Sequence, residues 1–441
     1  MQLHRSSSWV LVPVALGLLG SGCTRATGFC QLDTDCAAGS TCSIATSTCQ
    51  PAANTDLGPG PDLPGTPRLG TRLPAPSGSA IGDYFGSTVA LGSGFAVLGA
   101  YLAKSGQGVV YTAELTGSTL GPYTPFSSVD MPVGYDYFGI SVAAYGNTMV
   151  IGASNKEAGK GAVYVYTRSG VTFSAPTKLV AADGVAGDYF GSSVSLFGDT
   201  LVVGAAYKGG TFGAAYVFTR GLTGVWSPSV RLPAPLEGAL VTGDYFGQQV
   251  AASTSYVAVA APGRTLNAGA VYLYKFDPLG MVWKQTTPTG PLVLGSAPGE
   301  QLGSALAMSA TTLAVGSAAY SPSPLVFAQG GVQIFSLEKA TAPIPLTLAD
   351  PAPRDRFGAA LSLVPPAAGL PEVLLVGAPG RNQAFVYNNL EPWQRSAVLE
   401  VPLEGARSAV GSSVATTGTR HLLGTRGLTQ DIGTAYFYSG N

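Results

Sequence analysis

Short apolar segments separated by turn residues repeat along most of the chain. One unit begins with an alternating segment such as Ser141-Val142-Ala143-Ala144, followed by a turn such as Gly146-Asn147. A more continuous apolar segment (201–205 in one unit), an apolar–aromatic segment (161–166) and a more polar segment (226–232) complete the pattern. Gly-Asn turns accept positive φ and join antiparallel strands. Each unit therefore predicts four antiparallel strands, which together form one propeller blade.

A four-residue motif marks the start of each unit. Asp-Tyr-Phe-Gly occurs at 83–86, 136–139, 188–191 and 244–247, and degenerate copies stand at 300–303, 355–358 and 408–411. The motif glycines are 53, 52, 56, 56, 55 and 53 residues apart. Because the period is nearly constant over seven copies, the sequence predicts an all-β, seven-bladed β-propeller over residues 71–441. We assign these motif residues to the repeat framework: Asp83, Phe85, Gly86, Asp136, Phe138, Gly139, Asp188, Phe190, Gly191, Asp244, Phe246, Gly247, Asp355, Phe357 and Gly358.

The two ends of the propeller region complement each other. The last unit stops at its third strand, Tyr436-Phe437-Tyr438, and lacks a fourth. Residues 71–76 resemble residues 230–235, which form the fourth segment of an internal unit. We therefore predict that residues 71–76 complete the last blade and close the ring without a free strand edge.

The repeats resemble FG-GAP repeats, the units of the integrin alpha-chain propeller and of many secreted bacterial proteins. Phe-Gly matches at 85–86, 138–139, 190–191, 246–247 and 357–358, and Gly-Ala-Pro matches fully at 377–379. Integrin-type repeats often bind calcium through an Asp-rich loop between the first two strands. Here that loop is a two-residue turn in most blades, and its longest version, 365–371, has no carboxylate. Calcium needs several oxygen ligands, so we predict no metal and no cofactor.

The N-terminus resembles a bacterial lipoprotein signal peptide over residues 1–22. The apolar run Trp9–Leu19 is too short to span a bilayer but suits a signal peptide. Gly20-Ser21-Gly22-Cys23 places small residues before a cysteine, so the resemblance implies lipidation at Cys23. It further implies an outer-membrane lipoprotein, held to the membrane by its lipid and facing the periplasm or the cell surface. Ordinary signal cleavage and an uncleaved membrane anchor are the alternatives.

A small cysteine-rich segment and a linker precede the propeller. Four cysteines fall within residues 23–49 after Cys23, and their spacing lacks the paired Cys-x-x-Cys of zinc sites. We predict two disulfides among Cys30, Cys36, Cys42 and Cys49, with all three pairings open. Residues 50–70 alternate proline and glycine and predict an extended linker.

Composition narrows the function. The net charge is −1 and only 11% of residues are charged, so no global field attracts nucleic acid. The chain has two histidines, His4 and His421, and the repeated carboxylates recur once per blade, as structural residues do. We therefore predict a binding protein, not an enzyme. The alternative is a lyase or hydrolase with residues from the irregular fifth and seventh units, namely Glu300, Gln301, Arg407, His421 and Asp431.

Candidate ligand-binding residues lie in the loops that join strands four to one and two to three, which share one face of such propellers. Four tyrosines of the repeated motif stand in the first set of loops: Tyr84, Tyr137, Tyr189 and Tyr245. Cations gather in the second set: Lys104, Lys156, Lys160, Lys208, Arg264, Arg381 and Arg426. They predict a basic collar for an extracellular polysaccharide or protein, displayed by a monomeric adhesion module. The alternatives are packing of the tyrosines between blades, pairing of the cations with the motif carboxylates, and a passive scaffold.

Overall fold

The computed structural model describes residues 40–43, 48–51, 67–130, 134–235, 239–287, 290–322, 327–339, 341–366, 370–390, 392–401, 409–425 and 432–439. The chain divides into two compact units, Met1–Pro61 and Asp62–Asn441. In the first, β1 (Ser40–Ser43) pairs with β2 (Thr48–Pro51), and the register sets Cys42 opposite Cys49. The predicted signal peptide, Cys23, Cys30 and Cys36 lie outside the described residues. Within the described part, no helix is long and apolar enough to cross a membrane.

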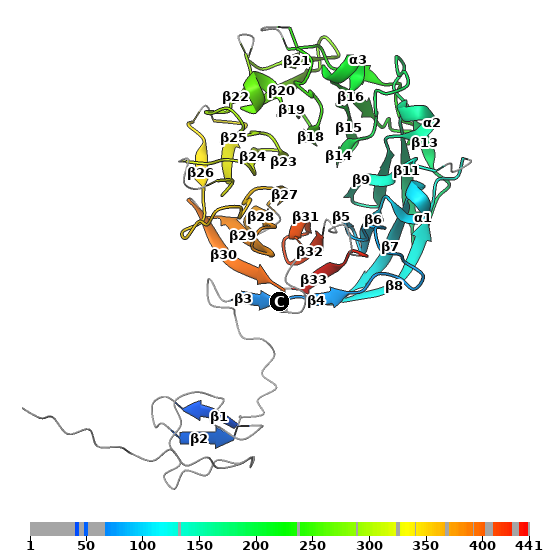
Figure 1. Ribbon diagram of the computed structural model, residues 1–441. Helices are drawn as coiled ribbons and strands as arrows, with labels where there is room; N and C mark the ends of the chain where they lie inside the picture. Colours follow the sequence, from blue (N-terminus) through cyan, green and yellow to red (C-terminus); the bar gives the residue numbers. More distant parts are fainter. Residues whose placement is uncertain are drawn as a thin grey trace, which may run out of the picture. The chain divides into compact units, whose positions relative to one another are not determined.

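The second unit is a ring of seven antiparallel sheets (Figure 1), which confirms the seven-bladed propeller. Blade 1 consists of β5 (Thr88–Gly92), β6 (Phe95–Ala100), β7 (Val109–Thr116) and β8 (Thr119–Phe126). Blade 2 consists of β9 (Phe138–Tyr145), β10 (Thr148–Ala153), β11 (Ala162–Ser169), β12 (Thr172–Phe173) and β13 (Thr177–Leu179). Blade 3 consists of β14 (Ser193–Phe197), β15 (Thr200–Ala205), β16 (Ala214–Thr219) and β17 (Val230–Arg231). Blades 4 and 5 are β18 (Gln249–Ala252), β19 (Tyr256–Ala261), β20 (Ala270–Asp277), β21 (Val282–Gln285), β22 (Val293–Leu294); and β23 (Ala305–Met308), β24 (Thr312–Ser317), β25 (Gly331–Ser336), β26 (Ile344–Leu346). Blades 6 and 7 are β27 (Ala360–Val364), β28 (Val373–Ala378), β29 (Gln383–Asn389), β30 (Trp393–Glu400); and β31 (Val410–Thr416), β32 (Arg420–Thr425), β33 (Ala435–Ser439), with β4 (Thr71–Leu73).

Ring closure occurs as the sequence predicts, with one addition. β4 pairs antiparallel with β33 and supplies the outer strand of blade 7, with Leu73 opposite Ala435. β3 (Pro67–Leu69), which we had placed in the linker, pairs parallel with β30 at the outer edge of blade 6. Its composition suits a linker, but the free edge of β30 satisfies its backbone groups. The N-terminal segment therefore covers the outer edges of two neighbouring blades.

The motif phenylalanine joins each blade to the blade before it. Phe246 is 1% exposed, and its ring meets Tyr272 of its own blade with centroids 5.7 Å apart. Its amide donates to the carbonyl of Phe212 in the preceding blade, at 3.1 Å. One residue thus supplies both core packing within a blade and a backbone contact between blades, which explains why this position repeats.

The two glycine positions of the repeat are explained by close approach of neighbouring blades. Gly191 has φ +89, a conformation that L side chains rarely adopt, and its carbonyl faces blade 2. A Cβ on Gly152 would lie 2.2 Å from that carbonyl oxygen, so any side chain there would clash. Ser141 Oγ donates to the same oxygen at 2.8 Å. Gly204 and Gly247 repeat this contact between blades 3 and 4.

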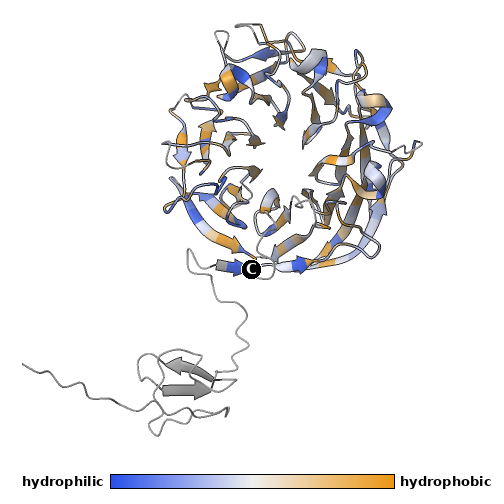
Figure 2. Cartoon of the chain, viewed as in Figure 1, coloured by the Kyte–Doolittle hydropathy of each residue, from blue (hydrophilic) through white to orange (hydrophobic). Residues whose placement is uncertain are grey.

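The hydrophobic core lies between the blades. Each of seven clusters of buried apolar residues joins members of two neighbouring blades, such as Val150 of β10 with Val203 of β15. Figure 2 shows hydrophobic residues along the strands of every blade. The strands therefore form a rigid support for the loops at the two ends of the ring.

Candidate functional site

The four-to-one and two-to-three loops meet at one end of the propeller, which we call the loop face. The amide of Asn155, in a two-to-three loop, donates to the carbonyl of Asp136 at 3.2 Å. The amide of Tyr137 donates to the carbonyl of Gly106 in the preceding blade at 2.9 Å. The loops of neighbouring blades therefore support one another around the ring.

Four short turns form the two-to-three loops of the first four blades: α1 (Ala103–Gly106), α2 (Lys156–Gly159), α3 (Lys208–Thr211) and α4 (Arg264–Asn267). They are not regular helices, because their two central residues are left-handed. In α2 these are Glu157 at φ 54 and Ala158 at φ 58. In α3 the same two positions are Gly209 and Gly210, residues that adopt positive φ without strain.

Four of the predicted ligand-binding cations are bound internally, by the motif carboxylates. The pairs are Lys156 Nζ–Asp136 Oδ2 at 2.9 Å, Lys208 Nζ–Asp188 Oδ2 at 2.8 Å, Arg264 Nη1–Asp244 Oδ2 at 2.7 Å and Arg381 Nε–Asp355 Oδ2 at 2.9 Å. All four carboxylates are buried. The positive charge of the predicted basic collar is therefore largely neutralised within the protein. For these four cations the alternative interpretation, pairing with the motif carboxylates, is the one that the structure shows.

Each of these cations also holds the loop that leads into its blade. Lys208 Nζ donates to the carbonyl of Asp183, five residues before its partner Asp188, at 2.7 Å. The amide of Val185 donates to Asp188 Oδ2 at 2.9 Å, so one carboxylate oxygen accepts from both the turn and the lysine. We call each such set of contacts a loop clamp. A regular spacing in the sequence could have predicted these pairs. Each clamp cation stands four residues after the same position of the second strand, namely Gly152, Gly204, Ala260 or Gly377.

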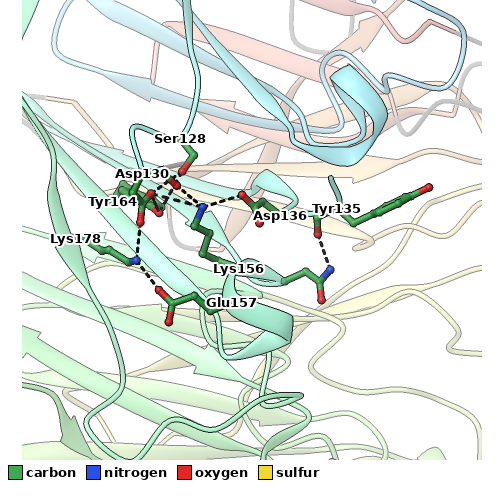
Figure 3. A network of polar contacts seen from close by, with 9 residues as sticks. Ser128, Asp130, Tyr135, Asp136, Lys156, Glu157, Tyr164 and Lys178 are labelled. Carbon is green, nitrogen blue, oxygen red and sulfur yellow. Dashed lines mark hydrogen bonds and ion pairs between the residues drawn. The ribbon is translucent and has the colours of Figure 1, made fainter. Parts of the chain in front are cut away.

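The loop clamp of blade 2 is the most extended (Figure 3). Lys156 lies between Asp136 and Asp130, and Lys178 joins Asp130 at 2.6 Å to Glu157 at 2.8 Å. Partial burial opposes ionisation of Asp130, but hydrogen bonds from Lys178, Tyr164 and Ser128 hold its pKa well below its usual range. The carboxylate therefore stays charged, and the two ammonium groups offset most of the negative charge of the three carboxylates in the network.

The other three cations occupy different positions. Lys104 is exposed and stands where blade 2 has Glu157, whereas Ala103 takes the clamp position of blade 1. Lys160 is half-buried. Neither lysine forms an ion pair in the part of the chain that the structure describes, and Arg426 lies outside that part. Lys104 follows Gly99 by five residues and Lys160 follows Gly152 by eight, so neither lysine stands at the clamp position of the repeat.

The four motif tyrosines share an unusual backbone conformation. Their φ values are 58, 58, 54 and 55, and each side chain is half-buried. Two further tyrosines, Tyr101 and Tyr207, which the sequence analysis missed, lie between them. The ring centroid of Tyr101 is 5.9 Å from the centroids of both Tyr84 and Tyr137. The ring centroid of Tyr207 is 5.1 Å from that of Tyr189 and 5.6 Å from that of Tyr245. Together with Tyr135 we call these residues the tyrosine arc: Tyr84, Tyr101, Tyr135, Tyr137, Tyr189, Tyr207 and Tyr245.

The tyrosine arc both packs between blades and faces solvent. Tyr207 contacts tyrosines of blades 3 and 4, yet 46% of its surface is exposed. Tyr135 is 60% exposed and lies 6.3 Å from Tyr137. The arc therefore presents aromatic surface that is already held in place by its neighbours.

The sevenfold pattern breaks in blades 5 to 7. The left-handed position held by tyrosine in blades 1 to 4 is Gln301, Arg356 and Ala409 there, with φ 55, 56 and 46. A hollow of about 490 Å³ lies beside these residues, also lined by Phe327 and Arg354. We call it the blade 5–7 hollow. The loop face is thus aromatic over four blades and hollowed over three.

A family model for the FG-GAP repeat matches three segments, residues 132–166, 173–218 and 240–274. The chain therefore contains FG-GAP repeats. The matched segments lie in blades 2, 3 and 4, where the tyrosine motif is complete. A search of curated proteins gives no significant match. Among solved structures, the FG-GAP propeller is similar to a catalytically inactive virginiamycin B lyase from Staphylococcus aureus with quinupristin, at 6% identity and a TM-score of 0.49, over 83% of this chain and 98% of that one.

Of the residues considered for an enzymatic alternative, the described Glu300 and His421 lie in different parts of the propeller. Glu300 is buried in its turn, where its carboxylate accepts from the Ser296 amide at 2.6 Å. His421 is buried in blade 7 beside the turn between the first two strands, away from the loop face, and Thr416 Oγ1 lies 2.9 Å from its ring. Burial, with the nearby charge of Arg68, lowers the pKa of His421 to about 3. Arg407 and Asp431 lie outside the described residues.

The described part of the chain contains no cluster of three or more His, Cys, Asp or Glu side chains that could hold a metal ion. The buried ion pairs of the loop clamps hold the loops of the propeller in place. Such a propeller is a binding or scaffold module.

Proposed function

We propose that this protein is a lipid-anchored binding module of the outer membrane, whose FG-GAP propeller engages an extracellular polysaccharide or protein through its loop face. The observation that carries the proposal is the tyrosine arc, a set of exposed and half-buried aromatic side chains on a face whose regular pattern is interrupted by a hollow. Tyrosine combines an apolar ring with a polar hydroxyl, so it suits partially hydrated binding surfaces.

Preorganisation supports binding by the tyrosine arc. Tyr207 lies against Tyr189 and Tyr245, so its ring position is set before any ligand arrives. A side chain that is already ordered loses little conformational entropy on binding. The loop clamps contribute to the same end, because they hold the loops that carry Tyr137 and Tyr189.

Binding through the tyrosine arc is tested by Tyr207→Ala in the full chain, against dextran, xylan, polygalacturonate and fibronectin. We expect the wild type to bind at least one probe, and the variant to bind it at least about tenfold more weakly, since aromatic anchors dominate binding surfaces. Tyr145→Ala is the matched control, because Tyr145 is 40% exposed and contacts Phe197 in the turn region of the opposite face. Absence of binding to every probe, or equal loss in both variants, would favour the passive scaffold.

Anchoring is tested separately by Cys23→Ser. The proposal rests on the small residues before Cys23 and on the linker that follows the cysteine-rich segment. We expect wild-type protein in the membrane fraction and the variant either unprocessed or released, because the serine cannot carry the thioether-linked lipid. Metabolic labelling with palmitate gives a second readout. Equal labelling and fractionation of both proteins would contradict lipidation at this residue.

A further inference from the structure

We propose that the blade 5–7 hollow binds carboxylate groups of an acidic polysaccharide. This inference deepens the proposed function and rests on it. Two arginines, Arg354 and Arg356, line the hollow on either side of the clamped Asp355. They occupy the positions that Tyr135 and Tyr137 hold in blade 2, so the same backbone presents two guanidinium groups instead of two phenol rings.

The backbone beneath the two arginines is fixed. The amide of Arg354 donates to the carbonyl of Phe327 at 2.8 Å, and that of Arg356 donates to Ala328 at 3.1 Å. Both residues are left-handed, with φ 68 and 56, as are Tyr135 and Tyr137. The left-handed position of Arg356 recurs in every blade, so the backbone that carries the arginines belongs to the repeat framework and is ordered before a ligand arrives.

Among the described residues, no carboxylate pairs with either of the two arginines, whereas each cation of a loop clamp is paired with a carboxylate. Arg381 of the same blade is 20% exposed and pairs with both Asp350 and Asp355. By contrast, Arg354 and Arg356 are exposed and form no ion pair with any carboxylate in the described parts of the chain. The residues that line the hollow include no Asp or Glu. An anion that enters it therefore meets net positive charge.

The chemistry of the lining indicates the class of ligand. A guanidinium presents two parallel N–H donors that match the two oxygens of a carboxylate. Gln301 adds an amide suited to hydroxyl groups, and Phe327, 65% exposed, adds an apolar ring. A volume of about 490 Å³ is typical of small-ligand sites. Carboxylate, hydroxyls and an apolar ring face occur together in a uronic acid residue.

The hollow borders blade 4, the blade that carries the last tyrosine of the arc, and this favours a polymer over a single small anion. The amide of Gln301 donates to the carbonyl of Asn267 in α4 at 2.8 Å, which joins the hollow to blade 4. Blade 4 carries Tyr245, the last tyrosine of the arc. A chain of linked sugars could therefore place one acidic residue at the arginines and neighbouring rings along the tyrosines.

The test compares binding of the full chain to polygalacturonate and to its methyl ester, which has the same sugar rings without the charge. We expect the wild type to prefer the acid and to lose that preference at high salt. Arg354→Gln and Arg356→Gln should each weaken binding to the acid about tenfold, as for a lost charged hydrogen bond. Arg356→Lys should recover only part of it. Lys339→Gln, at an exposed position on the opposite face, is the control and should bind like the wild type.

Three results would overturn the inference. Equal binding of the acid and its ester, with no effect of the arginine variants, would show that the tyrosine arc binds glycans without this anion site, and the proposed function would stand. Equal binding of polyglutamate and polygalacturonate would assign the hollow to acidic protein segments. If the wild type bound none of the polymers, both the proposed function and this inference would be wrong.

Discussion

Removal of residues 66–78 is expected to abolish the folded monomeric propeller. The deletion takes away β3 and β4, and with them the outer strands added to blades 6 and 7. Leu73 of β4 is 8% exposed and packs in one cluster with Phe85 of blade 1 and Phe437 of blade 7. Without it, the backbone of β33 is left as an unpaired edge beside an opened core, which favours unfolding or association between chains.

Size-exclusion chromatography with light scattering and a thermal melt would measure this loss. The matched control is a deletion of equal length, residues 52–64, taken from the predicted linker before β3. We expect the control to stay monomeric with an unchanged Tm, since its residues precede both edge strands. A monomer with wild-type melting after deletion of 66–78 would contradict closure of the ring by this segment.

Replacement of one clamp cation is expected to cost roughly 3–5 kcal/mol of folding free energy, the range for a buried charge that loses its partner. Lys208→Met leaves Asp188, whose side chain is 4% exposed, without the ammonium group 2.8 Å away. It also removes the donor to the Asp183 carbonyl, which is one of the contacts that hold the loop before blade 3. Asp188→Asn in the same chain should recover part of the loss, because a neutral amide tolerates burial better than a carboxylate.

The control for this measurement is Lys284→Met. Its ion pair with Asp277 is 2.6 Å long, but the lysine side chain is 64% exposed. Exposed pairs contribute about 0–1 kcal/mol, so chemical denaturation should barely change. If the two variants were equally stable, the loop clamps would have no structural role, and their cations would again be candidates for ligand binding.

The sequence by itself determined the architecture. An even period of the Phe-Gly motif sets the number of blades, and short turns such as Gly146-Asn147 and Gly198-Asp199 join the first two strands of their blades. The similarity of residues 71–76 to an internal fourth strand was sufficient to predict closure, and β4 confirms it. These features were readable because each follows from local backbone preferences or from a repeat that copies them seven times.

Tertiary structure alone decided which side chains meet. Lys156 and Asp136 are 20 residues apart, and their pairing depends on how a turn of one blade meets the loop that enters it. Tyr101 and Tyr207 became part of the aromatic arc because neighbouring blades stand close enough for their rings to touch. β3 became a strand only because the edge of β30 was free. Such contacts depend on how neighbouring blades and loops pack, so the regular spacing of the clamp residues along the chain becomes informative only once the structure shows that they meet.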